Sequence, residues 1–163
     1  MRNKKKIFGL LSILIWLGVI FYFSSRDSSV STIQTKFVIN RLMELAEDSE
    51  FFNLIILKLT ENHSLVYSIR KLAHIIIFAI LQIIVFNAIM YNGKSILKSS
   101  IYSIIIVVLY AIFDEVHQYF TPGRSYQLKD VFIDTIGGSI GLIISYLVLL
   151  LRFALSKITQ KLK

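Results

Sequence analysis

Four apolar runs, each close to membrane-spanning length, divide this chain of 163 residues. They cover residues 7–23, 72–91, 99–113 and 131–151. An α-helix needs roughly 20 apolar residues to cross the hydrocarbon core of a bilayer. We therefore expect an all-α membrane protein with four transmembrane helices, the third continuing through a polar end to residue 118.

The charged residues are unequally distributed among the segments outside these runs. The N-terminal stub, the second connection and the C-terminal tail together hold ten basic residues and none of the ten acidic ones. An excess of Lys and Arg marks the cytoplasmic side of a membrane protein. The pattern predicts that both termini are cytoplasmic and that residues 24–70 and 118–130 face outward.

Composition narrows the function classes. The formal net charge of +8 follows from this topology and favours attraction to anionic lipid on the inner leaflet. It does not indicate a nucleic-acid partner, because the basic residues form no binding patch. The absence of cysteine excludes disulfides, thiolate catalysis and cysteine-bound zinc. We expect a single domain over residues 1–163.

The first apolar run has two interpretations. Basic residues followed by a hydrophobic run resemble a secretory signal peptide. The run is long, however, and no small-residue cleavage site follows it, so we expect an uncleaved helix. If it were cleaved, three helices would remain with the same outward connections.

The first outward connection, 24–70, is expected to contain amphipathic or interfacial helices. Asp27 or Ser28 could cap a helix start. Apolar residues then recur at helical spacing with charged residues between them, which is typical of a helix lying on the membrane surface. A second apolar stretch, 51–59, is too short to span and is predicted to be another interfacial or packed helix.

Ionisable residues at membrane depth cluster at the outward ends of the helices. Such groups cost roughly 2.5–3.5 kcal/mol each on insertion scales, so they usually have a partner or a function. Singly, each has a structural explanation as a helix cap, a snorkelling cation or a packed histidine. Together they predict a ligand site formed by Lys71, His74, Asp114, Glu115, His117, Gln118, Arg124, Asp130 and Asp134.

Sequence spacing indicates which of these side chains meet. Lys71 and His74 share a helix face, as do Asp130 and Asp134. The short turn at 121–124 should make the third and fourth helices neighbours. We expect Arg124 to form an ion pair with Asp114, Asp130 or Asp134, and His74 to lie close to the third or fourth helix.

The fourth helix carries a stripe of small residues below its acidic end. Gly137 and Gly141 form a Gly-x-x-x-Gly element, which allows two helices to approach closely. We expect this helix to turn the stripe inward and to pack tightly against another.

The motif Asp114-Glu115-x-His117-Gln118, followed by Pro122-Gly123-Arg124 and Asp130-x-x-x-Asp134, resembles the VanZ-like family of bacterial membrane proteins. Arg70-Lys71-x-x-His74 fits the same family, whereas residues 28–69 match it only in general character. The resemblance implies a multi-pass protein of the bacterial cytoplasmic membrane. The founding member is associated with reduced susceptibility to teicoplanin, and no biochemical activity is established for the family. The implied partner is a membrane lipid or a lipid-linked cell-wall precursor.

Three mechanisms remain open. In the first, basic residues bind an anionic headgroup and carboxylates bind sugar hydroxyls or a cation. In the second, an enzyme acts on a lipid-linked phosphate, with His74 or His117 as the catalytic group and Asp114, Asp130 and Asp134 as candidate metal ligands. A transporter is disfavoured, because the inner halves of the helices hold almost no ionisable residues. The sequence specifies neither a cofactor nor an oligomeric state.

Overall fold

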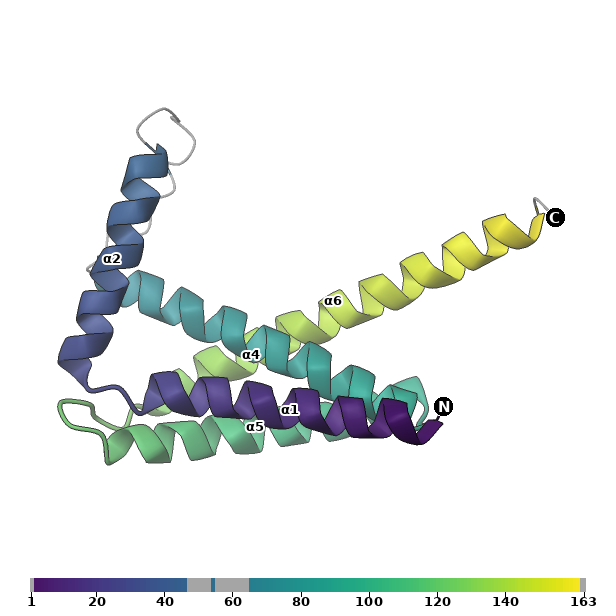
Figure 1. Ribbon diagram of the computed structural model, residues 1–163, viewed down its shortest axis with the longest axis horizontal. Coiled ribbons are helices and arrows are strands. Elements are labelled where there is room, and N and C mark those ends of the chain that lie inside the picture. Colours follow the sequence, from purple (N-terminus) through teal and green to yellow (C-terminus); the bar gives the residue numbers. More distant parts are fainter. Residues whose placement is uncertain (1, 47–53, 55–64, 162–163) are drawn as a thin grey trace.

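The computed structural model describes residues 2–46, 54 and 65–161, and these residues form an all-helical bundle (Figure 1). The helices are α1 (Arg2–Ser24), α2 (Ser28–Ala46), α4 (Leu65–Tyr91), α5 (Ile96–Tyr119) and α6 (Leu128–Lys161). Of these, α1, α4, α5 and α6 are long and apolar enough to cross a membrane. The predicted fold, a multi-pass membrane protein with four spans, is confirmed.

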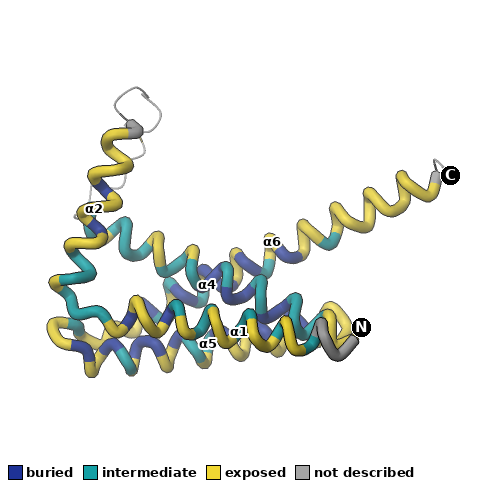
Figure 2. Tube along the Cα trace, viewed as in Figure 1, coloured by how far each residue is buried: buried dark blue, intermediate teal, exposed yellow. Residues whose placement is uncertain are grey.

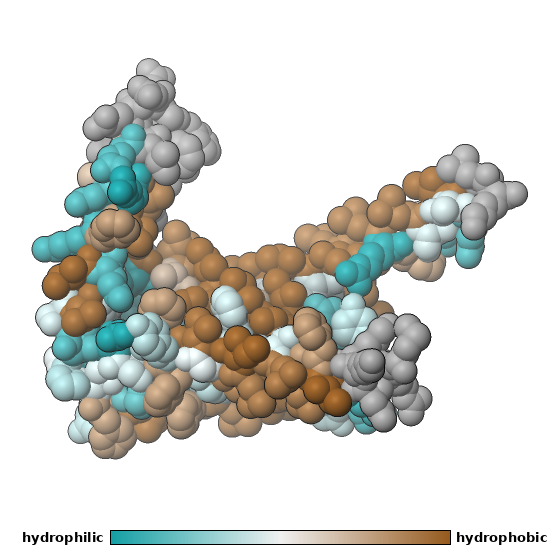
Figure 3. Space-filling model, viewed as in Figure 1, coloured by the Kyte–Doolittle hydropathy of each residue, from teal (hydrophilic) through white to brown (hydrophobic). Residues whose placement is uncertain are grey.

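The bundle has two chemically different ends. At one end, here called the polar end, α1 and α5 finish, α4 and α6 begin, and the connection 120–127 joins α5 to α6 (Figure 1). At the other, the turn end, α4 passes into α5 through a tight turn in which Gly93 has a φ of 84°. Brown apolar surface covers the sides of the bundle in Figure 3, and teal hydrophilic surface gathers beside α2.

Helices α4 and α6 are held together by the predicted Gly137-x-x-x-Gly141 element, here called the glycine seam. A side chain added at Gly137 would overlap the backbone of Ile75, and one added at Gly141 would overlap the backbone of Ala79. Only a hydrogen atom fits at these two positions, so the helices pack backbone to backbone. This close approach brings the acidic N-terminal end of α6 against the basic end of α4.

Helix α5 covers the same region from another side. Phe78, Leu81 and Val85 of α4 form a buried cluster with Val107 and Ala111 of α5. The dark-blue stretches of α4 and α5 in Figure 2 follow this core.

Two aromatic hydrogen bonds fix α1 against this core. The Trp16 indole N–H donates to the Ile77 carbonyl at 3.0 Å, and the Tyr110 hydroxyl donates to the Leu17 carbonyl at 2.8 Å. These two aromatic side chains therefore connect α1 to the backbone of α4 and α5 to the backbone of α1.

Helix α2 begins where it was predicted and runs transverse to α1 (Figure 1). Asp27 caps it, because one carboxylate oxygen accepts the Val30 backbone N–H at 2.9 Å and the Ser29 hydroxyl at 2.6 Å. These two hydrogen bonds hold the pKa of the Asp27 carboxyl below its ordinary value. The predicted interfacial helix at 51–59 lies outside the described residues, except for residue 54.

Helix α6 continues to Lys161, well past the predicted end of its span at 151. No proline or glycine follows Gly141, and Leu, Arg, Lys and Ala all favour helix. The last turns are exposed and stand away from the other helices (Figure 2). The site therefore depends on only the first half of α6.

Candidate functional site

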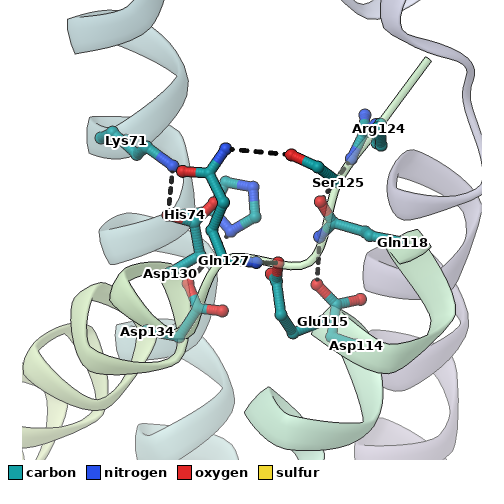
Figure 4. Close-up of polar contacts among 10 residues, drawn as sticks. All are labelled: Lys71, His74, Asp114, Glu115, Gln118, Arg124, Ser125, Gln127, Asp130 and Asp134. Atoms are coloured by element: carbon teal, nitrogen blue, oxygen red, sulfur yellow. Dashed lines mark hydrogen bonds and ion pairs between the residues drawn. The ribbon is translucent and has the colours of Figure 1, made fainter.

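Two polar contacts join α4 to α6 at the polar end (Figure 4). The Lys71 ammonium forms an ion pair with Asp130. One turn deeper, His74 Nδ1 lies 3.0 Å from Asp134 Oδ1. The three-residue spacing on α4 and the four-residue spacing on α6 place the two contacts one above the other, as the shared helix faces predicted.

A chain of hydrogen bonds connects α5 to the α5–α6 connection (Figure 4). The Gln118 amide donates to Asp114 Oδ2 at 2.7 Å, and Arg124 Nη1 donates to the Gln118 carbonyl oxygen at 2.8 Å. Among the described residues Arg124 forms no ion pair with a carboxylate, so its predicted salt bridge is wrong. The physical reason is that Gln118 stands between Arg124 and Asp114 and satisfies both.

Glu115 holds the connection in place from below. One carboxylate oxygen accepts the backbone N–H of Gln127 at 2.6 Å. Its other oxygen, Oε2, is buried and has no hydrogen-bond partner among the described residues. Sequence reasoning missed Gln127, and no periodicity could have found it, because its contribution is a loop backbone N–H.

His117 is the predicted site residue that the structure does not bring to the others. Its Nε2 lies 3.0 Å from the Ser25 hydroxyl, and its ring stacks on Phe21 with centroids 4.4 Å apart. Both contacts are with the end of α1 and the turn after it. This position gives His117 a packing role at the α1–α5 contact.

Three ligand-type side chains converge from three different helices. His74 of α4, Asp114 of α5 and Asp134 of α6 each present an atom, and these atoms lie within 4.8 Å of one another. The sequence-based metal candidates were Asp114, Asp130 and Asp134; the structure pairs Asp130 with Lys71 instead and puts His74 in the group. His74 is therefore the residue to consider with the two deeper aspartates.

The acidic groups in this region are deeply buried. Asp134 is 0% exposed, and Asp114 and Glu115 are each 1% exposed. Asp134 Oδ2, like Glu115 Oε2, lacks a hydrogen-bond partner among the described residues. Buried carboxylate oxygens without a partner are costly, so the arrangement calls for a compensating cation or donor.

Two cavities adjoin at the polar end and share two arginines. A polar cavity of about 210 Å³ is lined by Lys71, Asp130, Gln118 and the connection, together with Arg70 and Arg124. An apolar cavity of about 280 Å³ lies between α1, α2 and α4, and Arg70, Arg124 and His74 also line it. The two guanidinium groups thus stand where a hydrophilic space meets a hydrophobic one.

Arg124 has both acidic and basic neighbours, with Asp114, Glu115 and Asp130 acting against Arg70. Burial and the neighbouring Arg70 guanidinium both lower the pKa of Arg124 from its ordinary value. Its Nε is buried and has no hydrogen-bond partner among the described residues. An anion in the polar cavity would relieve both conditions.

Comparison with known proteins identifies one family. The family model described as VanZ/LLP1 matches residues 8–151, a stretch that contains the second and third candidate spans whole, nearly all of the first, and the fourth as far as residue 151. No curated protein matches the chain, and no solved structure does.

Proposed function

The chain belongs to the VanZ/LLP1 family, and from that premise we propose that it binds an anionic lipid or a lipid-linked cell-envelope precursor. The headgroup lies in the polar cavity at the polar end of the bundle, and the hydrocarbon chain follows the apolar cavity. The proposal includes an outward orientation for this end, which the charge distribution favours.

The main support for this proposal is that the two cavities share lining residues. Arg70 and Arg124 line both the hydrophilic and the hydrophobic space. An amphiphile has the same arrangement, with an anionic group joined directly to an apolar chain. Helix α2 lines the apolar cavity, and its transverse direction suits a helix lying at the membrane surface.

The basic residues of the site differ in their availability. Lys71 is engaged by Asp130. Arg70 and Arg124 form no ion pair with any residue that the structure describes. Guanidinium groups bind phosphate oxygens in pairs through a planar fork of donors, so these two residues are the expected phosphate ligands.

A binding titration with three probes tests the proposal. Purified full-length protein in lipid nanodiscs is titrated with farnesyl phosphate, farnesol and inorganic phosphate. We expect farnesyl phosphate to bind most tightly, because only this probe fills both cavities. Replacing Arg124 with Gln, or Arg70 with Gln, should weaken its binding about tenfold or more, since one charge-assisted hydrogen bond contributes about 1.5–3 kcal/mol.

The matched control is Lys94→Gln, which removes a basic residue from the exposed turn end. It should leave farnesyl phosphate affinity unchanged. Equal affinity for farnesol and farnesyl phosphate would contradict a headgroup site. If Lys94→Gln weakened farnesyl phosphate binding as much as the arginine variants do, the loss would reflect the protein's overall charge and not a specific site.

The proposal extends to glycopeptide susceptibility. A protein that binds or modifies a lipid-linked precursor at the outer face changes the target that glycopeptides meet there. Expression in a Gram-positive host should raise the inhibitory concentration of teicoplanin, and Arg124→Gln, expressed at the same level, should not. If wild-type protein and Arg124→Gln raised the inhibitory concentration of teicoplanin equally, the resistance would not depend on this site.

The His74–Asp134 contact favours a second candidate, hydrolysis of a lipid-linked phosphate. His74 lines the apolar cavity beside both arginines and is oriented by a buried carboxylate. That is the arrangement of a general base whose imidazole is held by a second group. Release of inorganic phosphate from farnesyl diphosphate by wild-type protein, abolished in His74→Gln, would favour hydrolysis over binding alone.

A further inference from the structure

The deepest charged cluster of the bundle lies below the proposed headgroup position. His74, Asp114 and Asp134 come from α4, α5 and α6, so three spanning helices meet at this one point (Figure 4). The glycine seam forces α4 and α6 together next to it, at Gly137 and Ile75. The close contact of α4 and α6 therefore keeps His74 and Asp134 near each other.

The hydrogen bonds of the cluster do not neutralise it. Gln118, a neutral amide, donates to one oxygen of Asp114. His74 shares a hydrogen bond with one oxygen of Asp134, whose second oxygen is fully buried and has no partner among the described residues. The nearest lysine, Lys71, pairs with Asp130 one turn above. Two carboxylates at membrane depth thus face a single imidazole.

We propose that His74, Asp114 and Asp134 bind one divalent transition-metal ion. Two carboxylates and a neutral imidazole carry a charge of −2, which such an ion balances. The partnerless Oδ2 of Asp134 is the atom that points to a missing ligand. The inference does not rest on lipid binding.

The donor types select the class of metal. Imidazole nitrogen suits Zn²⁺ and Fe²⁺, and the two carboxylates also suit Mn²⁺, whereas Ca²⁺ and Mg²⁺ are bound mainly by oxygen ligands. In the tetrahedral geometry usual for zinc, bonds of about 2.0–2.2 Å place the ligand atoms about 3.3–3.6 Å from one another. The three atoms, already within 4.8 Å of one another, reach that spacing by side-chain rotation.

The proposed metal ion would lie next to the apolar cavity. His74 also lines the apolar cavity between α1, α2 and α4. Three protein ligands leave a further coordination position open on a transition-metal ion. An oxygen of a phosphate or of water in the adjoining space is the chemical class that fits such a position.

Metal titration of the whole protein tests the proposal. Full-length protein in detergent, treated with a chelator and then freed of it, is titrated with Zn²⁺, Mn²⁺, Mg²⁺ and Ca²⁺. We expect one Zn²⁺ or Mn²⁺ per chain, and binding at least tenfold weaker for Mg²⁺ and Ca²⁺. Asp114→Asn and Asp134→Asn should each weaken Zn²⁺ binding at least tenfold, and Glu44→Gln, which neutralises an exposed carboxylate on α2, should not.

A cysteine variant tests the site by the appearance of an absorption band and not by a loss of metal affinity. The chain has no cysteine, so His74→Cys supplies the only thiol. A thiolate bound to Co²⁺ produces a near-ultraviolet charge-transfer band, which neither imidazole nor carboxylate produces. We expect that band in His74→Cys on addition of Co²⁺. The matched control is His117→Cys, whose thiol would face Phe21 and Ser25 and should give no band.

The outcomes separate clearly. Wild-type protein that binds no Zn²⁺ or Mn²⁺ with defined stoichiometry overturns the proposal. So does a charge-transfer band of equal strength in both cysteine variants. Because farnesyl phosphate binding is measured independently, a failure here leaves the lipid proposal intact, and a failure there leaves this one intact.

Discussion

The two ends of the bundle bury polar side chains of different kinds. At the turn end the buried polar groups are neutral: the Gln82 amide donates to the Ser103 hydroxyl at 2.7 Å, and Ser100 bonds the Tyr146 hydroxyl at 2.8 Å. At the polar end the buried polar groups include four carboxylates, those of Asp114, Glu115, Asp130 and Asp134.

Both ends leave some buried atoms without a described partner, but the consequences differ. At the turn end these atoms are neutral, an amide oxygen of Gln82 and a hydroxyl of Ser99. At the polar end they belong to Glu115, Arg124 and Asp134. A buried charge costs far more than a buried hydroxyl unless it is paired. The neutral contacts hold helices together, whereas the charged atoms without a described partner are the ones that the proposed headgroup and metal ion would satisfy.

The largest expected difference between the two ends is their position relative to the membrane. Lys94 and Ser125 are both exposed, one at each end. Each is replaced by Cys in turn, and no other cysteine competes. In intact cells an impermeant maleimide should label Ser125→Cys fully and Lys94→Cys only after permeabilisation, because the basic segments stay inside. The reverse labelling pattern would place the site on the cytoplasmic face.

The glycine seam connects the two ends, and breaking it should damage both. Gly141→Leu drives a side chain into the Ala79 backbone, which we expect to destabilise the fold by at least about 3 kcal/mol. The measurement is the yield and melting temperature of the monodisperse protein in detergent. Gly18→Leu is the control, since nothing lies within 4 Å of a side chain added there. If both substitutions lowered the yield and melting temperature equally, the close contact at Gly141 would not be what stabilises the bundle.

A pair of substitutions sharpens the distinction between packing and ligand binding. Ser103→Ala leaves the buried Gln82 amide without its acceptor, so it should cost about 1–3 kcal/mol of stability and leave Zn²⁺ affinity unchanged. Asp134→Asn keeps the shape of the side chain and removes its charge, so it should change stability little and weaken Zn²⁺ binding. Thermal unfolding and metal titration of both variants check this. If Asp134→Asn proved the more destabilising of the two, Asp134 would be a structural ion-pair partner of His74.

The smallest expected effect concerns the cap of α2. Hydrogen bonds lower the pKa of the Asp27 carboxyl, so protonation favours the unfolded state. The stabilisation is present above the ordinary pKa of Asp, about 3.9, and is lost as the pH falls through the lowered folded-state value. The melting temperature of wild-type protein should exceed that of Asp27→Asn slightly at pH 7, and the difference should shrink as the pH falls below about 3.9. A difference that grew toward acid pH would contradict the cap.

Much of this architecture follows from the sequence because membrane helices are specified by simple patterns. The four spans, the start of α2 and the Gly137–Gly141 contact each follow from run length, periodicity or residue size. The vertical order of the Lys71–Asp130 and His74–Asp134 contacts follows from helical spacing.

The choice of hydrogen-bond partner within the site depends on side-chain rotamers, which sequence spacing does not fix. His117 and Gln118 follow Asp114 by three and four residues on α5, a spacing that puts both near its face. Neighbouring residues on a helix point about 100° apart, so only one of them can face the same cluster as Asp114. Gln118 does, and it also takes the hydrogen bond of Arg124 that an aspartate was expected to take. His117 points to α1 instead.

Native mass spectrometry of protein extracted directly from membranes tests the central claim, that the polar end binds an anionic amphiphile. The account predicts that wild-type protein carries a phosphate-bearing lipid and that a variant combining Arg70→Gln and Arg124→Gln loses it, with Lys94→Gln behaving as wild type. The same lipid retained in equal amount by the double variant would contradict the account.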